Sequence, residues 1–539
     1  MTIRPIPPRP SLEFDRKQAK ALLDALRAGD PAALARFRAS HPRFRDAAPG
    51  GRGLEQAALH DAQLVIAREY GSASWPRWKQ FVEARMLDSA GRAAALIRAA
   101  FTGDMRKATA LLDAEPTLAE HDLYTACVTG AAARVARLLA GEPALVRRRG
   151  GPLDHEPLLY ACFSRFLRVD RARATGIVEA VRLLLQHGAD PNVFYVLEEE
   201  DGGRWQQFPI YGAAGIANNP ELTGLLLAAG ADVNEGKPEP PPGAVARALG
   251  SEDLYHATEF ADTTCLRLLL DAHPHRGRVS YALARMLDFE NPEGVALLLR
   301  HGADPNLRVE WMHDRTHLHR AIAYGRTLPI IRMLVEAGGD PNAADDVGET
   351  PLGYAVRQGR DDAAALLRAA GGDDARVTDA ERVAGARARG DRATPGGPID
   401  PDLLCNAACR NDAAEIRRLV AAGADPSAPG GLDGTAPIHW AAWRGQYEAT
   451  KALVEAGADI HTLNRYDSDA LDMAMHGSQH CHDPFGGMAM KLPEEITHGD
   501  YPAVAELLIA AGSRPRKRML FGSDAVKEVL RRYGVPDAE

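Results

Sequence analysis

The stretch "LPIIRMLVEAGGDPNAADDVGETPLGYAVRQG", residues 328–359, contains two short helical patterns with turn residues between them. Apolar residues recur at helical spacing over 330–335, and Gly338 follows them closely. Glycine commonly ends a helix because it has no Cβ to clash in the left-handed conformation. Thr350 is a good N-cap, and Pro351 suits the first position of a new helix. The stretch therefore predicts a helix, a polar turn and a second helix.

The turn in this stretch recurs along the chain. Its copies are HGADPN (187–192 and 301–306), AGADVN (229–234), AGGDPN (337–342), AGADPS (422–427) and AGADIH (456–461). Copies beginning at 301, 337 and a degraded 370 are 36 and 33 residues apart, and those at 422 and 456 are 34 apart. Such a constant period indicates that one structural unit is repeated along the chain.

The start of the second helix recurs as well. Its copies are EPLLYAC (from 156), FPIYGAA (208), THLHRAI (316), TPLGYAV (350), APIHWAA (436) and DALDMAM (469). TPLxxA and GADPN at this period resemble the ankyrin repeat. The resemblance implies an all-α solenoid of stacked helix-turn-helix pairs, about eleven of them between residues 94 and 513.

The ends and interruptions of the period suggest a domain organisation. Residues 1–90 lack the repeat pattern and are similar to the N-terminal helical region before ankyrin arrays in bacterial proteins, so we expect a helical cap with helix pairs at 14–42 and 53–86. The expected parts are the cap (1–90), a first stack (91–372), a linker or partial repeat (373–399), a second stack (400–515) and a closing helix (516–539). Long insertions at 195–207, 234–252 and 476–502 should project from one edge of the solenoid.

Composition narrows the class of protein. The 539 residues carry a formal net charge of -9, with 64 basic and 73 acidic residues, which argues against nucleic-acid binding through a basic surface. Six scattered cysteines form no disulfide framework, and no apolar segment is long enough to span a bilayer. The N-terminus has no apolar signal region. These features predict a cytoplasmic protein that binds neither nucleic acid nor membrane, and the Ala- and Arg-rich composition suggests a bacterial source.

One segment could bind a metal. The run HGSQHCHD contains His476, His480, Cys481 and His482, and His498 follows in the same insertion. Histidine and cysteine are zinc ligands, and two histidines four residues apart fit one helical turn. Gly477, Ser478 and Pro484 disfavour a regular helix here, and no CxxC or HExxH motif accompanies the run. A metal-dependent enzyme or metal-binding protein using residues 476–498 is therefore the alternative reading, and we assign no metal ligand.

Other residues of chemical interest have structural explanations. Cys405 and Cys409 lie on one helical face and should pack between helices. His317, His319 and His439 fall in or near the TPLH position, where the resemblance implies hydrogen bonds across turns. The sequence has no nucleophile elbow, phosphate-binding loop or dinucleotide fingerprint after a predicted strand. It predicts a protein that is not an enzyme and needs no cofactor.

The resemblance implies a scaffold that binds an unidentified protein. In the ankyrin family the turn tips and the inner helices of the concave surface contact the partner, and Trp, Tyr and Arg are typical of binding hot spots. The candidate contact residues are Trp205, Gln206, Phe208, Trp311, His313, Asp345, Asp346, Glu349, Trp440, Trp443, Arg465 and Tyr466. We expect the protein to act as a monomer.

Overall fold

The computed structural model describes residues 4–7, 10–45, 57–72, 74–198, 204–236, 252–260, 262–308, 314–391, 399–430, 434–480, 499–514 and 522–533. The chain forms two compact units. The first consists mainly of residues 1–98 and 106–121, and the second of residues 99–105 and 122–536.

The first unit is helical. Its elements are α1 (Leu12–Arg27), α2 (Pro31–Ser40), η1 (Pro42–Phe44), α4 (Leu59–Glu69), α5 (Trp75–Met86), most of α6 (Ser89–Thr102) and α7 (Met105–Ala114), and η2 (Pro116–Glu120). Asp30 caps α2, and α1 and α2 form the helix pair that the sequence predicts at 14–42. Trp78 is buried and donates its indole N–H to Asp15 at 2.7 Å. Residues 57–86 contain the two further helices that the sequence predicts.

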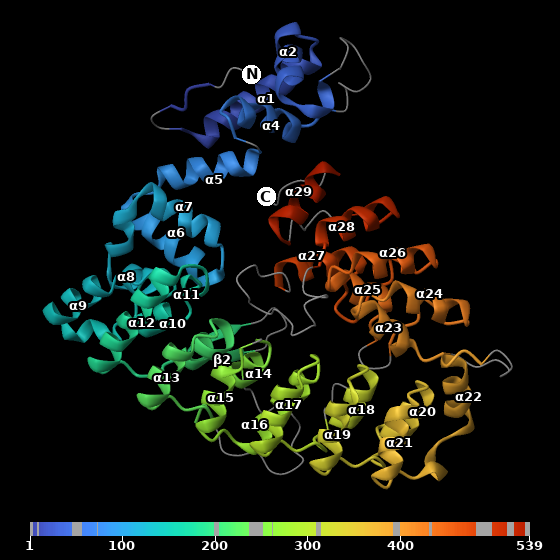
Figure 1. Cartoon of the computed structure of the whole chain (residues 1–539). Helices are drawn as coiled ribbons and strands as arrows, with labels where there is room; N and C mark the ends of the chain where they lie inside the picture. The colour runs from blue at the N-terminus through green and yellow to red at the C-terminus, as the bar shows by residue number, and fades with distance from the viewer. Residues whose placement is uncertain are drawn as a thin grey trace. The chain divides into compact units, whose positions relative to one another are not determined.

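The second unit consists of helix pairs that follow one another along the chain (Figure 1). The first helices of the pairs, called here the first row, are α8 (Leu123–Thr129), α10 (Pro157–Cys162), the π-helix η4 (Tyr211–Ile216), α14 (Glu252–Ala257), α16 (Arg276–Met286), α18 (His317–Ala323), α20 (Pro351–Arg357), α23 (Pro401–Cys409), α25 (Pro437–Trp443) and α27 (Ala470–His480). Most neighbours in this row pack against each other.

The second helices of the pairs form a second row. They are α9 (Ala132–Gly141), α12 (Arg171–Gln186), α13 (Pro220–Ala228), α15 (Thr264–Asp271), α17 (Pro292–Arg300), α19 (Leu328–Glu336), α21 (Asp361–Ala369), α24 (Ala413–Ala421), α26 (Tyr447–Glu455) and α28 (Tyr501–Ala510). Shorter elements are η3 (Pro143–Arg147), α11 (Phe166–Val169) and η7 (Asp374–Arg376), and α29 (Asp524–Arg532) packs on α28. The expected all-α solenoid is confirmed.

The repeat at 328–359 forms as its residues predict. Gly338 has a φ of +94°, in the left-handed region, directly after the C-cap of α19. Thr350 caps α20 by accepting a hydrogen bond from the backbone N–H of Gly353 at 3.1 Å, and Pro351 is the first residue of that helix. Local chemistry thus fixes where the first helix ends and where the second begins.

Three segments differ from, or add to, the expected pattern. Within the insertion at 195–207, β1 (Tyr195–Glu198) and β2 (Arg204–Gln207) form an antiparallel hairpin in which Leu197 faces Trp205. Within the irregular segment 373–399, α22 (Asp379–Ala388) packs on α20 in the first row. The doubt about a helix over Gly477 and Ser478 was wrong, since α27 extends to His480.

The apolar core of the later repeats is continuous. It extends from Ile399 to Leu530 and includes Leu404, Ile438 and Leu471, one from each successive first-row helix. Each pair buries its apolar stripe against its neighbours rather than around one central point, as expected of a repeat protein.

Candidate functional site

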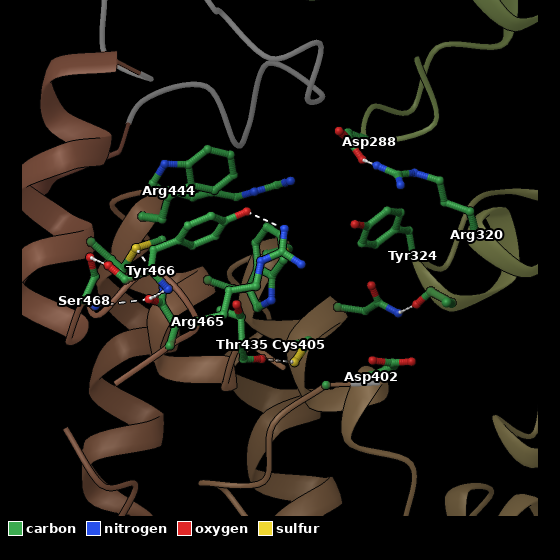
Figure 2. A pocket seen from close by; sticks show the side chains of 18 of the residues that line it. Asp288, Arg320, Tyr324, Asp402, Cys405, Thr435, Arg444, Arg465, Tyr466 and Ser468 are labelled. Carbon is green, nitrogen blue, oxygen red and sulfur yellow. Dashed lines mark hydrogen bonds and ion pairs between the residues drawn. The ribbon is translucent and has the colours of Figure 1, made fainter. Parts of the chain in front are cut away.

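A cavity of about 430 Å³ opens within the second unit. First-row helices and the turns that precede or follow them supply its lining, from α14 and α16 through α18 and α23 to α25 and α27. In Figure 2, Asp288, Arg320 and Tyr324 lie on one wall, and Arg444, Arg465 and Tyr466 lie on the opposite wall. Residues more than 150 positions apart in the sequence therefore face the same space.

Aromatic rings line much of the cavity. The Trp440 and Trp443 rings meet edge to face with centroids 5.7 Å apart, and Tyr324 of α18 meets Trp440 at 6.4 Å. Tyr466, in the turn before α27, is 63% exposed and accepts a hydrogen bond from Arg465 at 2.6 Å. Both tryptophans are half-buried. Large rigid rings that are only partly covered provide contact area at little cost in conformational entropy.

Charges on the wall of α16 and α18 neutralise one another. Asp288 pairs with Arg285 at 2.7 Å and with Arg320, and Arg285 also pairs with Glu259 at 2.7 Å. Burial alone would raise the pKa of Asp288, but the Arg320 and Arg285 charges outweigh that effect and hold the pKa below its usual value. These arginines therefore have their counter-ions within the protein.

Arg444 differs from these arginines. It is the C-cap residue of α25 and is only 7% exposed. Its guanidinium carbon lies 6.0 Å from the Trp440 ring centre and 5.9 Å from that of Trp443. Its buried Nε has no hydrogen-bond partner, and no acidic side chain in the described part of the chain pairs with it. An arginine buried without a counter-ion is costly, so its presence calls for an explanation.

The α23 wall is polar but nearly uncharged. Burial and the nearby Asp400 carboxylate together raise the pKa of Asp402 to about 7, which favours its neutral form. Asp402 accepts a hydrogen bond from the Tyr354 hydroxyl at 3.0 Å. Cys405 donates to the Thr435 carbonyl at 3.5 Å, and Asn406 donates to the Ala323 carbonyl at 2.6 Å. The last bond fixes α23 directly against the end of α18.

Four of the sequence-predicted contact residues meet at this cavity: Trp440, Trp443, Arg465 and Tyr466. The α25 tryptophans and the turn before α27 come together because α25 and α27 are neighbours in the first row. The other predicted residues that the structure describes lie elsewhere.

Three of those others belong to or follow the hairpin. Gln206 is exposed on β2 and Trp205 is half-buried beside it. The Trp205 indole nitrogen is buried with no hydrogen-bond partner. Phe208 is 7% exposed and packs on Phe194 with ring centres 5.4 Å apart, so its contact is internal.

The acidic residues of the turn before α20 have different roles. Asp345 is buried and accepts from the backbone N–H of Glu349 at 2.8 Å and from Arg315 at 3.1 Å. Asp346 is exposed. Glu349 pairs with Arg357 at 3.0 Å, yet burial raises its pKa to about 7. Asp345 thus shapes the turn, and Asp346 is the one of the three open to solvent.

The remaining candidates are two contact residues and the possible metal-binding insertion. Trp311, His313 and the insertion from Cys481 to His498 lie outside the described residues. Among the residues that the structure does describe, no group of three or more His, Cys, Asp or Glu is placed to hold a metal ion.

The histidines of the TPLH position are structural, as expected. His317, His319 and His439 hydrogen-bond through Nε2 to the carbonyl oxygens of Ser280, Glu349 and Thr462, at 2.9, 3.1 and 2.8 Å. Burial lowers the pKa of His317 and of His319 to about 4. The imidazoles of His317 and His319 are therefore neutral. His317 links its repeat to helix α16 of another repeat, whereas His319 and His439 bond to turn carbonyls.

Sequence reasoning missed Arg320, Tyr324 and Arg444. A usable signal existed, because aligning THLHRAIAYG with APIHWAAWRG places Arg320 at the position of Trp440 and Tyr324 at that of Arg444. These positions of the first helix face the cavity in both repeats. Repeat alignment alone could have selected them, although not their meeting across the cavity.

Comparison with known proteins identifies the repeat. A model of three ankyrin repeats matches residues 281–379, and a model of one ankyrin repeat matches residues 433–465. The chain contains ankyrin repeats. The two matched segments include the cavity residues of α16, α18 and α25.

Curated relatives share this repeat over part of their length. The chain is 30% identical over 231 residues to the human "Ankyrin repeat and SOCS box protein 6", covering 40% of this chain and 51% of that protein. It is 27% identical over 219 residues to the "E3 ubiquitin-protein ligase KEG" of Arabidopsis thaliana, covering 35% of this chain and 13% of that protein. It is 42% identical over 69 residues to the rice "Potassium channel KOR1", covering 13% of this chain and 8% of that protein. The chain thus spans about half or less of each relative.

None of the described helices has the length and apolar character that crossing a membrane requires.

Proposed function

We propose that this ankyrin-repeat protein is a scaffold that binds a partner protein, and that the partner docks at the cavity lined by α16, α18, α25 and α27. The observation that supports this proposal most is the convergence of rings and guanidinium groups from separate repeats on one partly open space. Trp, Tyr and Arg are the residue types that dominate binding energy at protein interfaces.

The repeat architecture suits such a role. Each first-row helix is held by its neighbours and by hydrogen bonds such as that from Asn406 to Ala323. A surface that is already ordered binds with a smaller loss of conformational entropy than a flexible one. Exposed apolar residues on turns near the cavity, Leu463 and Tyr466, extend the contact surface.

The finer features of the proposal come from the sequence. We infer about eleven repeats in two stacks, with the helices of residues 1–90 as a cap and a monomeric protein without enzymatic activity. We also place it in the cytoplasm of a bacterial cell. The described cysteines Cys127, Cys162, Cys265, Cys405 and Cys409 are all free, which is consistent with a reducing compartment.

In-cell crosslinking tests the docking surface. A photoreactive benzoyl-phenylalanine replaces Tyr466 at the cavity rim or, as a control, the exposed Arg332 on α19 of the second row. We expect a specific protein adduct from position 466 only. That adduct should decrease strongly when Trp440 and Trp443 are both replaced by alanine in a chain shown to be folded by circular dichroism. Adducts of equal yield at both positions, or none at 466, would contradict the proposal.

A further inference from the structure

We propose that the cavity binds the carboxylate of an acidic side chain in the partner, and that Arg444 is the residue that anchors it. This inference rests on the proposed docking function and adds the chemistry of the group that docks. It is carried by a buried guanidinium that has no counter-ion among the described residues and lies on the wall of a cavity large enough for a side chain.

The state of Arg444 in the free protein is the first step. Burial removes much of the water that would solvate its charge, and its Nε has no hydrogen-bond partner within the part of the chain that the structure describes. Arg444 also lines the cavity, beside Trp440 and Trp443. The planar guanidinium matches a carboxylate with two parallel hydrogen bonds, and such charge-assisted bonds are among the strongest in proteins.

The charges around the cavity select a monoanion. Arg285 and Arg320 are neutralised by Glu259 and Asp288, and Arg326 faces Glu290 at 3.7 Å. Arg465 lies at the exposed rim. Among the described residues, one buried positive charge at the cavity, that of Arg444, therefore remains without a counter-ion. A carboxylate supplies one negative charge, whereas a phosphate group near neutral pH brings between one and two.

The shape and lining select an acidic residue within an apolar segment. The cavity of about 430 Å³ exceeds the volume of one carboxylate group. Rings of Trp440, Trp443 and Tyr324 surround the space and would be covered by apolar neighbours of the acidic residue. Enclosure by these rings excludes water and so strengthens the ion pair with Arg444.

Fluorine NMR on the full chain labelled with 5-fluorotryptophan tests this proposal. The six tryptophans give separate probes, and the signals of Trp440 and Trp443 are assigned with W440F and W443F. The probe ligand is the blocked tripeptide acetyl-Leu-Glu-Leu-amide. The same tripeptide with Gln in place of Glu is the matched neutral ligand, and inorganic phosphate is the third arm.

We expect the Glu peptide to shift the Trp440 and Trp443 signals in a saturable way. The Gln peptide should bind at least about tenfold more weakly, as should phosphate, because a charge-assisted hydrogen bond contributes about that much to affinity. Arg444→Gln should lose about tenfold or more in affinity for the Glu peptide, and Arg444→Lys should lose less affinity. Arg417→Gln removes an exposed arginine of α24 with the same charge change and should leave binding unaltered.

Equal binding of the Glu and Gln peptides, tighter binding of phosphate, or full binding by folded Arg444→Gln would overturn the proposal. The crosslinking experiment separates this failure from failure of the docking function. If position 466 still captures a partner and Arg444→Gln leaves that adduct unchanged, the docking surface stands and the carboxylate anchor is wrong. If the Glu peptide binds through Arg444 but no partner is captured, the docking function is the part that fails.

Discussion

Asn306 is joined to Gly338 in the next turn: its side-chain amide donates a hydrogen bond to the Gly338 carbonyl oxygen at 2.8 Å. The carbonyl oxygen of the same side chain accepts from the backbone N–H of Asp340, also at 2.8 Å. Asn342 makes the same two bonds to the following turn, at 2.9 Å and 2.8 Å. The asparagine of the GADPN turn thus links neighbouring repeats, beyond forming its own turn.

Replacing Asn306 by alanine should therefore weaken the contact between two repeats. We expect a loss of about 1–2 kcal/mol in the free energy of unfolding, because two hydrogen bonds disappear. The measurement is urea unfolding, together with hydrogen exchange of the Asp340 amide, which should become faster. Asn306→Asp keeps the acceptor and should cost less than Asn306→Ala. Unchanged exchange at Asp340 in the alanine variant would show that the bond does not link the turns.

Glycine at 477 allows α27 to approach α25. A Cβ built at Gly477 would lie 1.9 Å from the Trp443 carbonyl oxygen, so Gly477→Ala must move one helix away from the other. We expect a loss of about 1–3 kcal/mol, the usual cost of overpacking, and changed fluorine signals for Trp443. Gly224, in α13, has open space around its Cβ position, and Gly224→Ala should stabilise the chain by about 0.5–1 kcal/mol. Similar thermal shifts for both variants would argue against the close contact.

Arg444 should lower the free energy of unfolding of the protein when no partner is bound. Replacing a buried, unpaired guanidinium by an apolar side chain of similar length removes a desolvation penalty. Arg444→Met is therefore expected to unfold at the same temperature as the natural chain or a few degrees higher in differential scanning calorimetry. If its stacking on Trp440 and Trp443 were a structural requirement, the variant would instead melt clearly lower, and the reading of Arg444 as a binding residue would lose its support.

Stability should depend on pH through Asp402. Burial and the neighbouring Asp400 raise its pKa from 3.8 to about 7, so the folded chain holds this proton more tightly than the unfolded chain. The proton bound to Asp402 contributes its full stabilisation of the folded chain below about pH 4. This contribution is lost as the pH rises toward 7. Asp402→Asn should therefore gain melting temperature relative to the natural chain between pH 4 and pH 8. For Asp271→Asn, at an exposed site, the difference in melting temperature from the natural chain should change much less with pH. A difference that does not change with pH for Asp402→Asn would refute the raised pKa of Asp402.

Cysteine accessibility should follow the structure. Burial raises the pKa of the Cys127 and Cys162 thiols well above the usual range and that of Cys265 to about 11. Cys409 is half-buried and lines the cavity. Among the five described cysteines, we expect N-ethylmaleimide to modify Cys409 first in the folded chain, as measured by peptide mass spectrometry. Faster labelling of Cys127 or Cys162 would contradict the packing of the early repeats.

Much of the fold could be predicted because its causes are local. Thr350, Pro351 and Gly338 act within a few residues of their own helix ends, and the structure has those ends where the sequence predicts them. The hairpin at 195–207 was missed because its strands lie in an insertion without repeat signals. The extension of α27 over Gly477 was missed because the tight contact with Trp443 outweighs the low helix propensity of glycine there.

The sequence by itself determined the repeat, its helix ends and its turns, because each depends on the conformational preferences of residues that are neighbours along the chain. It also selected Trp440, Trp443, Arg465 and Tyr466 as residues suited to binding. Only the tertiary structure decided that these residues face Tyr324 and Arg320 across one cavity and that none of the described acidic side chains pairs with Arg444 there. Each repeat is rotated slightly relative to the one before it, and these rotations add up over many repeats. No local pattern in the sequence predicts the total.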